Sequence, residues 1–149
     1  MILIAHRGNI DGKQIERENT ISYILEALGR GYDVEIDIRY IDAGNNNGAF
    51  YLGHDDPQEV CPDDILVNDH TWVHAKDIRT FKMLLDSEVS NTFFHQSDDT
   101  TLTSSGYMWT QPGKELTSRS IQVMPEYVSQ EFSRVCHAIC SYYVGEYEL

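Results

Sequence analysis

Basic residues are scarce in this chain of 149 residues, which has 11 Lys and Arg against 24 Asp and Glu and a formal net charge of −13. Duplex nucleic acid and anionic membranes attract clustered Lys and Arg, so the composition argues against both as partners. The sequence also lacks an apolar run of membrane-spanning length, internal repeats, low-complexity tracts and linkers. We therefore expect a single domain over residues 1–149, large enough to bury its own core.

Cysteine is rare too, and the three copies, Cys61, Cys136 and Cys140, form an odd set. No charged and then apolar signal segment precedes the first apolar run. These features predict a reduced, cytoplasmic protein. Cys136 and Cys140 do not have the spacing of a paired zinc motif, which favours the interpretation that both are small core residues.

The N-terminal stretch joins an apolar run to polar residues within a few positions. The run Ile2-Leu3-Ile4-Ala5 predicts a buried strand that ends at His6 and Arg7. Because α/β proteins place reacting groups at the carboxyl ends of their strands, His6 and Arg7 are candidate functional residues. A helix capped by Asn19 or Thr20 is predicted next. Its apolar residues at helical spacing are Ile21, Ile24, Leu25 and Leu28.

Segment 32–39 alternates between apolar and charged residues, which predicts a strand with two unlike faces. Its charged face carries Asp33, Glu35, Asp37 and Arg39. The turn at 42–48 is too short for a parallel crossover, so this strand and segment 49–55 should form an antiparallel hairpin. Folding the hairpin about Asn45 and Asn46 places Asp37 opposite His54.

Further short strands are predicted at 71–76, 91–95, 106–110, 120–124 and 137–141. Asp77 should cap a helix with an inner side of Ile78, Phe81, Leu84 and Leu85. Segment 126–135 also predicts a helix, with Val128, Phe132 and Val135 inside. Eight strands with about three helices favour an α/β fold, and specifically a shortened TIM-type (β/α) barrel with several outer helices reduced to loops, since an ordinary one needs about 250 residues. A smaller open α/β sheet is the alternative.

Four short motifs now stand in order over the first part of the chain. They are His6-Arg7-Gly8, Glu18-Asn19-Thr20, Glu35-x-Asp37 and His54-Asp55. In their order and separations they resemble the glycerophosphodiester phosphodiesterase family, a branch of the phospholipase C-like phosphodiesterase barrels. Looser similarity continues at Val73-His74-Ala75-Lys76 and at Ala138-Ile139-Cys140-Ser141-Tyr142.

The resemblance implies a role for each matching residue. His6 and His54 would be the general acid and base, a role that suits imidazole because it titrates near neutral pH. Arg7 and Lys76 would bind the phosphate. Glu35 and Asp37 would be metal ligands, and hard carboxylate oxygens suit Mg²⁺ or Ca²⁺. The supporting residues would be Glu18, Asn19 and Asp55.

One position departs from the family pattern. Where the family usually has a third carboxylate ligand two residues before the lysine, this chain has His74. A neutral histidine would weaken binding of Mg²⁺ or Ca²⁺ and could favour Mn²⁺ or Zn²⁺, or His74 could belong to a metal-free site. The long segment that usually follows the His-Asp pair and shapes the glycerol pocket is also missing, so the alcohol cannot be named.

The sequence thus predicts a metal-assisted phosphodiesterase that hydrolyses a small glycerophosphodiester-like substrate to a phosphomonoester and an alcohol. A catalytically reduced module that binds a sugar phosphate or phosphodiester is the alternative, and a metal-dependent hydrolase or isomerase of another barrel family is the third. A homodimer is plausible, because a barrel with few helices exposes apolar strand surface.

Several other residues have both a functional and an ordinary interpretation. His95, at a strand end, is a weaker site candidate, and Glu126 could replace the missing carboxylate. His70 and His137 are better explained as surface or capping residues. Tyr107 and Trp109 could line a cleft, although aromatic strand residues usually belong to the core.

Overall fold

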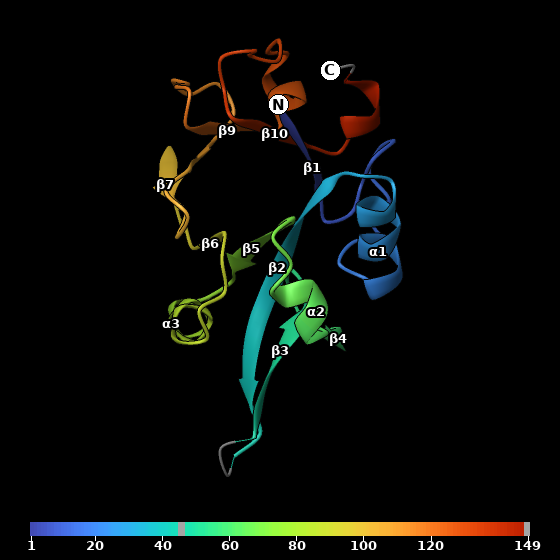
Figure 1. Cartoon of the computed structure of the whole chain (residues 1–149), viewed down its shortest axis with the longest axis vertical. Coiled ribbons are helices and arrows are strands. Elements are labelled where there is room, and N and C mark those ends of the chain that lie inside the picture. The colour runs from blue at the N-terminus through green and yellow to red at the C-terminus, as the bar shows by residue number, and fades with distance from the viewer. Residues whose placement is uncertain (45–46, 148–149) are drawn as a thin grey trace.

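A computed structural model describes residues 1–44 and 47–147, which form one mixed sheet with helices on its outer side (Figure 1). The strands are β1 Ile2–His6, β2 Asp33–Asp42, β3 Gly48–Leu52, β4 Glu59–Val60, β5 Thr71–Ala75, β6 Thr92–Phe93, β7 Thr100–Leu102, β8 Met108–Thr110, β9 Ser120–Val123 and β10 Ala138–Ser141. The α-helices are α1 Ile21–Gly29, α2 Asp63–Leu66 and α3 Ile78–Asp86. Two 3₁₀ helices, η1 Pro125–Val128 and η2 Val144–Glu146, lie in the last part of the chain.

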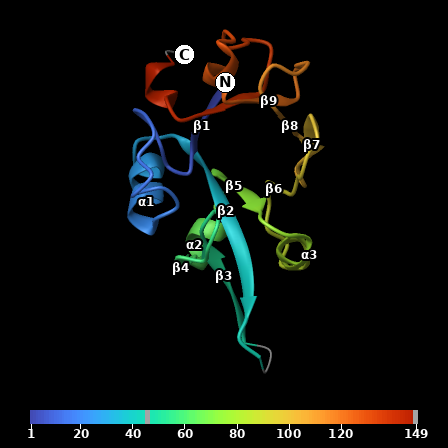
Figure 2. The same ribbon diagram turned by 180° about the vertical axis from the view of Figure 1, so that it is seen from behind.

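Parallel strands make up most of the sheet, in the order β6-β5-β2-β1-β10-β9-β8. The antiparallel strands β3, β4 and β7 extend it, and the β2–β3 hairpin projects away from the rest of the sheet (Figures 1 and 2). The sheet curves so that its β6 and β8 ends approach each other. Ser104 N–H donates to the Thr92 carbonyl (2.7 Å), and the rings of Phe93 and Trp109 stack with centroids 4.3 Å apart.

The predicted TIM-type barrel is wrong. Such a barrel needs a helix after each strand, but the part of the chain that the structure describes has only three short α-helices, all before β6. Three strands also run antiparallel to their neighbours, so the sheet is mixed. The described connections after β6 are loops and one 3₁₀ turn, and the 3₁₀ helix η2 packs against β1 and β10 in place of an α-helix.

Each of the eight predicted strands corresponds to a strand of the structure, whereas β4 and β7, of two and three residues, were not predicted. The helix predicted at 126–135 is wrong, because only η1 forms there, and Val128 and Val135 are exposed. Met124 and Ser129 on either side of η1 have positive φ angles of 43° and 49°. A non-glycine residue in that region interrupts a regular helix.

Helices α1 and α3 differ in how they begin. Asp77 caps α3 as predicted, since its Oδ1 accepts from Thr80 N–H at 2.7 Å. Thr20 is the first residue before α1, but its side chain makes no capping bond. The free Ile21 N–H donates instead to Glu59 Oε1 of β4 (2.8 Å), a cap from a distant strand. The predicted inner sides are only partly correct, because Leu25, Ile78 and Leu85 are exposed.

The two faces of the sheet bury two separate apolar clusters. The alternation predicted for β2 is confirmed: Val34, Ile36 and Ile38 belong to the outer cluster, which packs on the helices. The inner cluster lies within the curve of the sheet and includes Ile4, Trp72, Phe93, Trp109, Ile121 and Cys140. Cys61, Cys136 and Cys140 are all buried, which agrees with the core role predicted for the last two. Within residues 1–44 and 47–147, no helix has the length and apolarity that a membrane crossing requires.

The β2–β3 hairpin forms as predicted, but its register differs by one residue. Ile38 pairs with Leu52 and Tyr40 with Phe50, so the residue that faces Asp37 is Gly53 and not His54. Gly53 N–H donates to the Asp37 carbonyl at 3.0 Å. The predicted centre of the turn, Asn45 and Asn46, lies outside the described residues.

Candidate functional site

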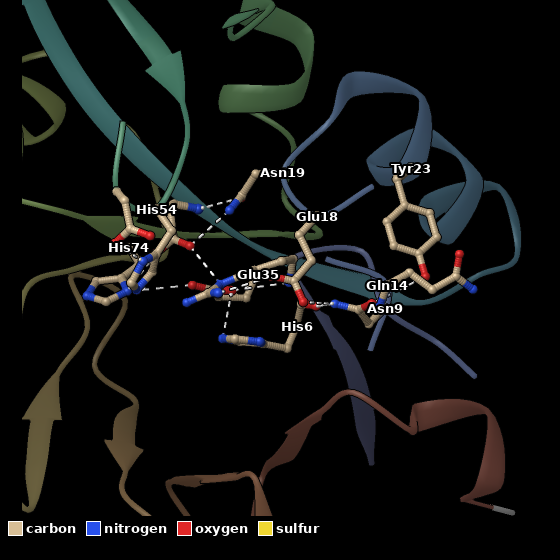
Figure 3. Close-up of polar contacts among 12 residues, drawn as sticks. His6, Asn9, Gln14, Glu18, Asn19, Tyr23, Glu35, His54 and His74 are labelled. Atoms are coloured by element: carbon tan, nitrogen blue, oxygen red, sulfur yellow. Dashed lines mark hydrogen bonds and ion pairs between the residues drawn. The ribbon is translucent and has the colours of Figure 1, made fainter. Parts of the chain in front are cut away.

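The carboxyl ends of β1 and β5 and the first half of β2 bring most of the predicted site residues together (Figure 3). Parallel pairing places His6 beside Glu35 and Asp37 beside His74. The side chains of these four residues contact one another on the inner side of the sheet, just above the inner apolar cluster. Residues from three separate parts of the chain therefore form one polar centre.

Asp37 is the centre of an ion network. Its Oδ2 lies 2.9 Å from Arg7 Nε, and its Oδ1 lies 3.1 Å from Lys76 Nζ and 3.2 Å from His74 Nδ1. Asp37 is fully buried, and burial alone would raise the pKa of its carboxyl. The contacts with His74, Arg7 and Lys76 outweigh burial and hold that pKa well below its usual value. Asp37 is therefore ionised at neutral pH.

Glu35 is the second buried carboxylate of the network. Its Oε2 lies 3.5 Å from His6 Nε2 and accepts from Arg7 N–H at 3.3 Å, while its Oε1 lies 3.6 Å from His74 Nδ1. Burial and the neighbouring Asp37 charge would raise the pKa of Glu35, but His6 and His74 lower it below the usual value. Two ionised carboxylates thus stand side by side on β2.

The two buried histidines have opposite pKa shifts. Burial lowers the pKa of His6 to about 4 despite the attraction of Glu35, so His6 is neutral at pH 7. Burial also disfavours charge on His74, but its short contacts with Asp37 and Glu35 raise its pKa above the usual value. His6 packs edge-on against Tyr142, with ring centroids 4.7 Å apart. The centre therefore contains one neutral imidazole and one with cationic character.

Glu18 and Asn19 support this centre from the loop before α1. Asn19 bonds to Asp37, which lies on β2 between the end of its pairing with β1 and the start of its pairing with β3. Asn19 Oδ1 accepts from Asp37 N–H (2.9 Å), and Asn19 Nδ2 donates to Asp37 Oδ2 (3.0 Å). Glu18 accepts from Arg7 Nη1 and from Asn9 Nδ2, both at 3.1 Å. Asn19 is thus a partner of Asp37, while Thr20 takes the position before the helix.

The loop geometry around Arg7 is unusual. Arg7 and Asn19 both have positive φ angles, of 55° and 57°, and Asn19 N–H donates to the Arg7 carbonyl at 3.2 Å. Asn tolerates this conformation, but for Arg it is sterically costly. The bonds of Arg7 to Glu18, Glu35 and Asp37 offset that cost.

A cavity of about 310 Å³ opens above the centre. One wall is charged and carries His6, Arg7, Glu35, His74 and Lys76. The opposite wall is formed mainly by Trp109, Val123, Met124, Tyr127 and Tyr142 from the β8, β9 and β10 end of the sheet. A second cavity of about 410 Å³ adjoins it and is lined by polar residues, among them Lys13, Glu18, Asp55 and Asp56.

His54 lines both cavities, as does Arg7. Its side chain is 41% exposed, and its Nδ1 lies 2.8 Å from Asp55 Oδ1. His54 is thus brought to the cavity as predicted, but by an exposed loop after β3 and not by a buried strand. Asp55 contacts only His54 among the residues of the centre.

Of the other candidates His95, Glu126, His70 and His137, only His95 lies at the first cavity. His95 lines the first cavity and stacks on His74 with centroids 4.7 Å apart. Glu126 is not a replacement ligand, because its Oε1 accepts from Ser141 Oγ (2.9 Å) and Tyr142 N–H (3.2 Å) and it does not line the cavity. His70 bonds to Asp33 at 2.7 Å and His137 stacks on Tyr107, both away from the centre.

Sequence reasoning did not single out Tyr142, Met124, Tyr127 and Gln111 as cavity residues. Tyr142 follows directly after β10, so the carboxyl-end argument used for His6 also applies to it. Met124 follows β9 in the same way. Apolar and aromatic side chains at those positions do not by themselves signal a site, whereas ionisable ones do.

The residues of the centre fit a divalent cation. Glu35, Asp37 and His74 each offer a ligand atom, and these atoms lie within 4.8 Å of one another, the one such group among residues 1–44 and 47–147. Asp37 Oδ1 and His74 Nδ1 already lie 3.2 Å apart, and a bound ion would take the place of that direct contact. Two carboxylates with one imidazole suit Mn²⁺ or Zn²⁺ as well as Mg²⁺.

Comparison with protein-family models, curated protein sequences and solved structures found no match. The resemblance to the glycerophosphodiester phosphodiesterases therefore rests on four short motifs. What the structure adds is spatial: side chains of all four motifs lie around one pair of adjoining cavities. Their family roles stay predictions.

Proposed function

We propose that this protein is a metal-assisted phosphodiesterase that hydrolyses a small, glycerophosphodiester-like substrate to a phosphomonoester and an alcohol. The observation that carries the proposal is the cluster of Glu35, Asp37 and His74 ligand atoms within 4.8 Å, beside the cations Arg7 and Lys76. That combination provides a place for a divalent cation and for an anion next to each other.

Charge balance supports the same conclusion. To bind an ion His74 must give up its proton, and the carboxylates of Glu18, Glu35 and Asp37 then face two cations, Arg7 and Lys76, with one net negative charge. A divalent cation reverses that to one positive charge, and a phosphodiester monoanion then restores neutrality. A strongly acidic protein thereby obtains a local site for an anionic substrate.

The cations of this chain would bind the phosphate. Arg7 carries a planar fork of donors that can contact two phosphate oxygens, and Lys76 adds a point charge from β5. A divalent cation held by Glu35, Asp37 and His74 would supply further positive charge for the transition state. The inner apolar cluster below excludes water from the floor of the cavity, which strengthens these interactions.

His6 and His54, two of the four histidines that line the cavity, are suited to proton transfer. One imidazole accepts the proton of the attacking hydroxyl as its oxygen bonds to phosphorus, and the other gives a proton to the leaving alkoxide as its bond to phosphorus breaks. His6 is neutral at pH 7 and can accept a proton. The attacking hydroxyl belongs to water or to a neighbouring group of the substrate.

A panel of phosphodiesters assayed with Mg²⁺, Ca²⁺ and Mn²⁺ tests the proposal. We expect turnover of at least one glycerophosphodiester, loss of that turnover with a chelator, and recovery on adding back metal. Failure to hydrolyse any member of the panel with any metal would exclude the phosphodiesterase assignment. Turnover that is indifferent to the chelator would remove the metal from it.

The exposure of His54 favours one alternative. His6 is buried, whereas His54 sits on an exposed loop and does not face Asp37, so a protein with this centre could bind a phosphodiester or sugar phosphate without turning it over. Calorimetry distinguishes the two: a binding module gives a heat of binding with glycerol phosphate and no product on long incubation with the diester.

A further inference from the structure

Arg39 is a half-buried residue of β2 that the proposed mechanism does not use. It lies two residues beyond Asp37 on the same face of the strand and lines neither cavity. No carboxylate among the described residues lies within ion-pair distance of it, although the other arginines of the first eighty residues each have one. A half-buried guanidinium without a carboxylate partner must be stabilised by another contact.

Among residues 1–44 and 47–147, the Arg39 side chain makes one hydrogen bond, to the His54 loop. Arg39 Nη2 donates to the His54 carbonyl oxygen at 2.6 Å, a short bond with a charged donor. Its Nε is buried and has no hydrogen-bond partner among the described residues, which is a cost that the bond to His54 must offset. The side chain is thus committed to the main chain of a predicted catalytic residue.

The loop that carries His54 has few other restraints. It is a short loop between β3 and β4, and the hydrogen bond from Gln58 N–H to the Leu52 carbonyl (2.8 Å) joins its two ends. Gly53 has a φ of 143°, and a side chain there would collide with the Asp56 carbonyl. Within the described part of the chain, the only hydrogen bond of the His54 ring is to Asp55, which is still more exposed. Two bonds therefore fix the His54 main chain to β2: Gly53 N–H to the Asp37 carbonyl, and Arg39 to the His54 carbonyl.

We infer that Arg39 is a positioning residue that holds the His54 imidazole at the mouth shared by the two cavities. Strand β2 then contributes in two ways. Its residues Glu35 and Asp37 form the charged centre, and Arg39 holds His54 in a fixed position relative to that centre. The buried His6 needs no such device because strand pairing and Tyr142 hold it. The kinetic part of this inference rests on the proposed phosphodiesterase function.

The test compares Arg39→Gln with Arg79→Gln. Arg79 also binds a residue of β2, since its Nη2 lies 2.7 Å from Asp42 Oδ2, but it is exposed and does not touch the His54 loop. Arg39→Gln should lower kcat about tenfold to a hundredfold with KM within about twofold, because Arg7 and Lys76 are untouched while a reacting group is displaced. Arg79→Gln should change neither constant.

A second readout does not need turnover. The Cε1–H signal of the His54 imidazole, assigned by its loss in His54→Ala, should shift or broaden in Arg39→Gln and stay in place in Arg79→Gln. If Arg39→Gln does not fold, Arg39→Lys serves instead and should give an intermediate change, since lysine keeps one charged donor. A folded Arg39 variant with wild-type kcat and a wild-type His54 signal overturns the inference. A wild-type protein that hydrolyses nothing overturns the proposed function, and the His54 signal then still decides the role of Arg39.

Discussion

The cavity joins two unlike parts of the sheet. The ends of β1 and β5 and the first half of β2 present His6, Arg7, Glu35, His74 and Lys76, whereas the ends of β8, β9 and β10 present chiefly apolar and aromatic side chains. The charged wall is also the half of the sheet with helical cover on its outer side. In the proposed phosphodiesterase, the charged wall would carry out the reaction and the apolar wall would select the ester group.

Asp37→Asn should have the largest effect on the charged wall. It removes a fully buried charge and leaves Arg7, Lys76 and His74 without their common partner, so we expect no measurable turnover and a loss of about 3–5 kcal/mol in the free energy of unfolding. Chemical denaturation and the phosphodiester assay measure both. Asp42→Asn, which removes the exposed partner of Arg79, is the control and should match the wild type in both assays.

His6→Ala and His54→Ala should each lower kcat by about 10²–10⁴, the usual contribution of a positioned acid or base. Both proteins should still fold, although His6→Ala also opens space beside Tyr142. Steady-state kinetics with thermal unfolding as a check separates loss of chemistry from loss of structure. Wild-type activity in either variant would show that the residue is not a proton-transfer group.

The charged wall should also make stability depend on pH. Burial lowers the pKa of His6 from 6.5 to about 4, so His6 is protonated in the unfolded chain at a higher pH than in the folded protein. The stabilisation that comes from keeping His6 neutral is therefore complete above pH 6.5 and is lost as pH falls toward 4. The loss should amount to about 3 kcal/mol. His74, with its raised pKa, acts in the opposite sense and at higher pH, since its stabilising charge is lost as pH rises through that pKa.

Denaturation of metal-free protein between pH 7.5 and 4.5 measures this effect. In His6→Gln the fall in unfolding free energy over that interval should be smaller than in the wild type. Equal pH dependence in both proteins would mean that His6 is not held neutral by the fold.

Tyr127→Ala should have the smallest effect, because it changes the apolar wall at a residue that is 62% exposed. We expect a loss of about 1 kcal/mol in transition-state binding, roughly fivefold in kcat/KM, for a phosphodiester with an apolar ester group. Tyr143→Ala is the matched control, since Tyr143 is an exposed tyrosine that lines neither cavity. Equal loss in the two variants would contradict a role of this wall in substrate fit.

The charged wall could be predicted from the sequence because its signals are local. Period-two alternation placed Glu35 and Asp37 on one face, and the rule of carboxyl strand ends marked His6 and Arg7, while the family resemblance pointed to Lys76. The strands themselves were predicted because each is a short apolar or alternating run. Strand pairing then made these local signals meet in space.

What could not be predicted depends on contacts between distant segments. The cap of α1 comes from Glu59, and the bond from Arg39 to His54 depends on a hairpin register that the sequence placed one residue away. The apolar wall has no ionisable residue to mark it. The barrel prediction was wrong because a count of strands does not reveal which connections fail to form helices.

Glu35, Asp37 and His74 are proposed to hold a divalent cation on which phosphodiester hydrolysis depends. The most direct measurement is a Mn²⁺ titration of chelator-treated protein, in which calorimetry measures metal binding and an assay of the same samples measures turnover. We predict binding of one equivalent with turnover rising in step, and neither in Asp37→Asn. Turnover that persists without metal, or Mn²⁺ binding that is unchanged in Asp37→Asn, would contradict the claim.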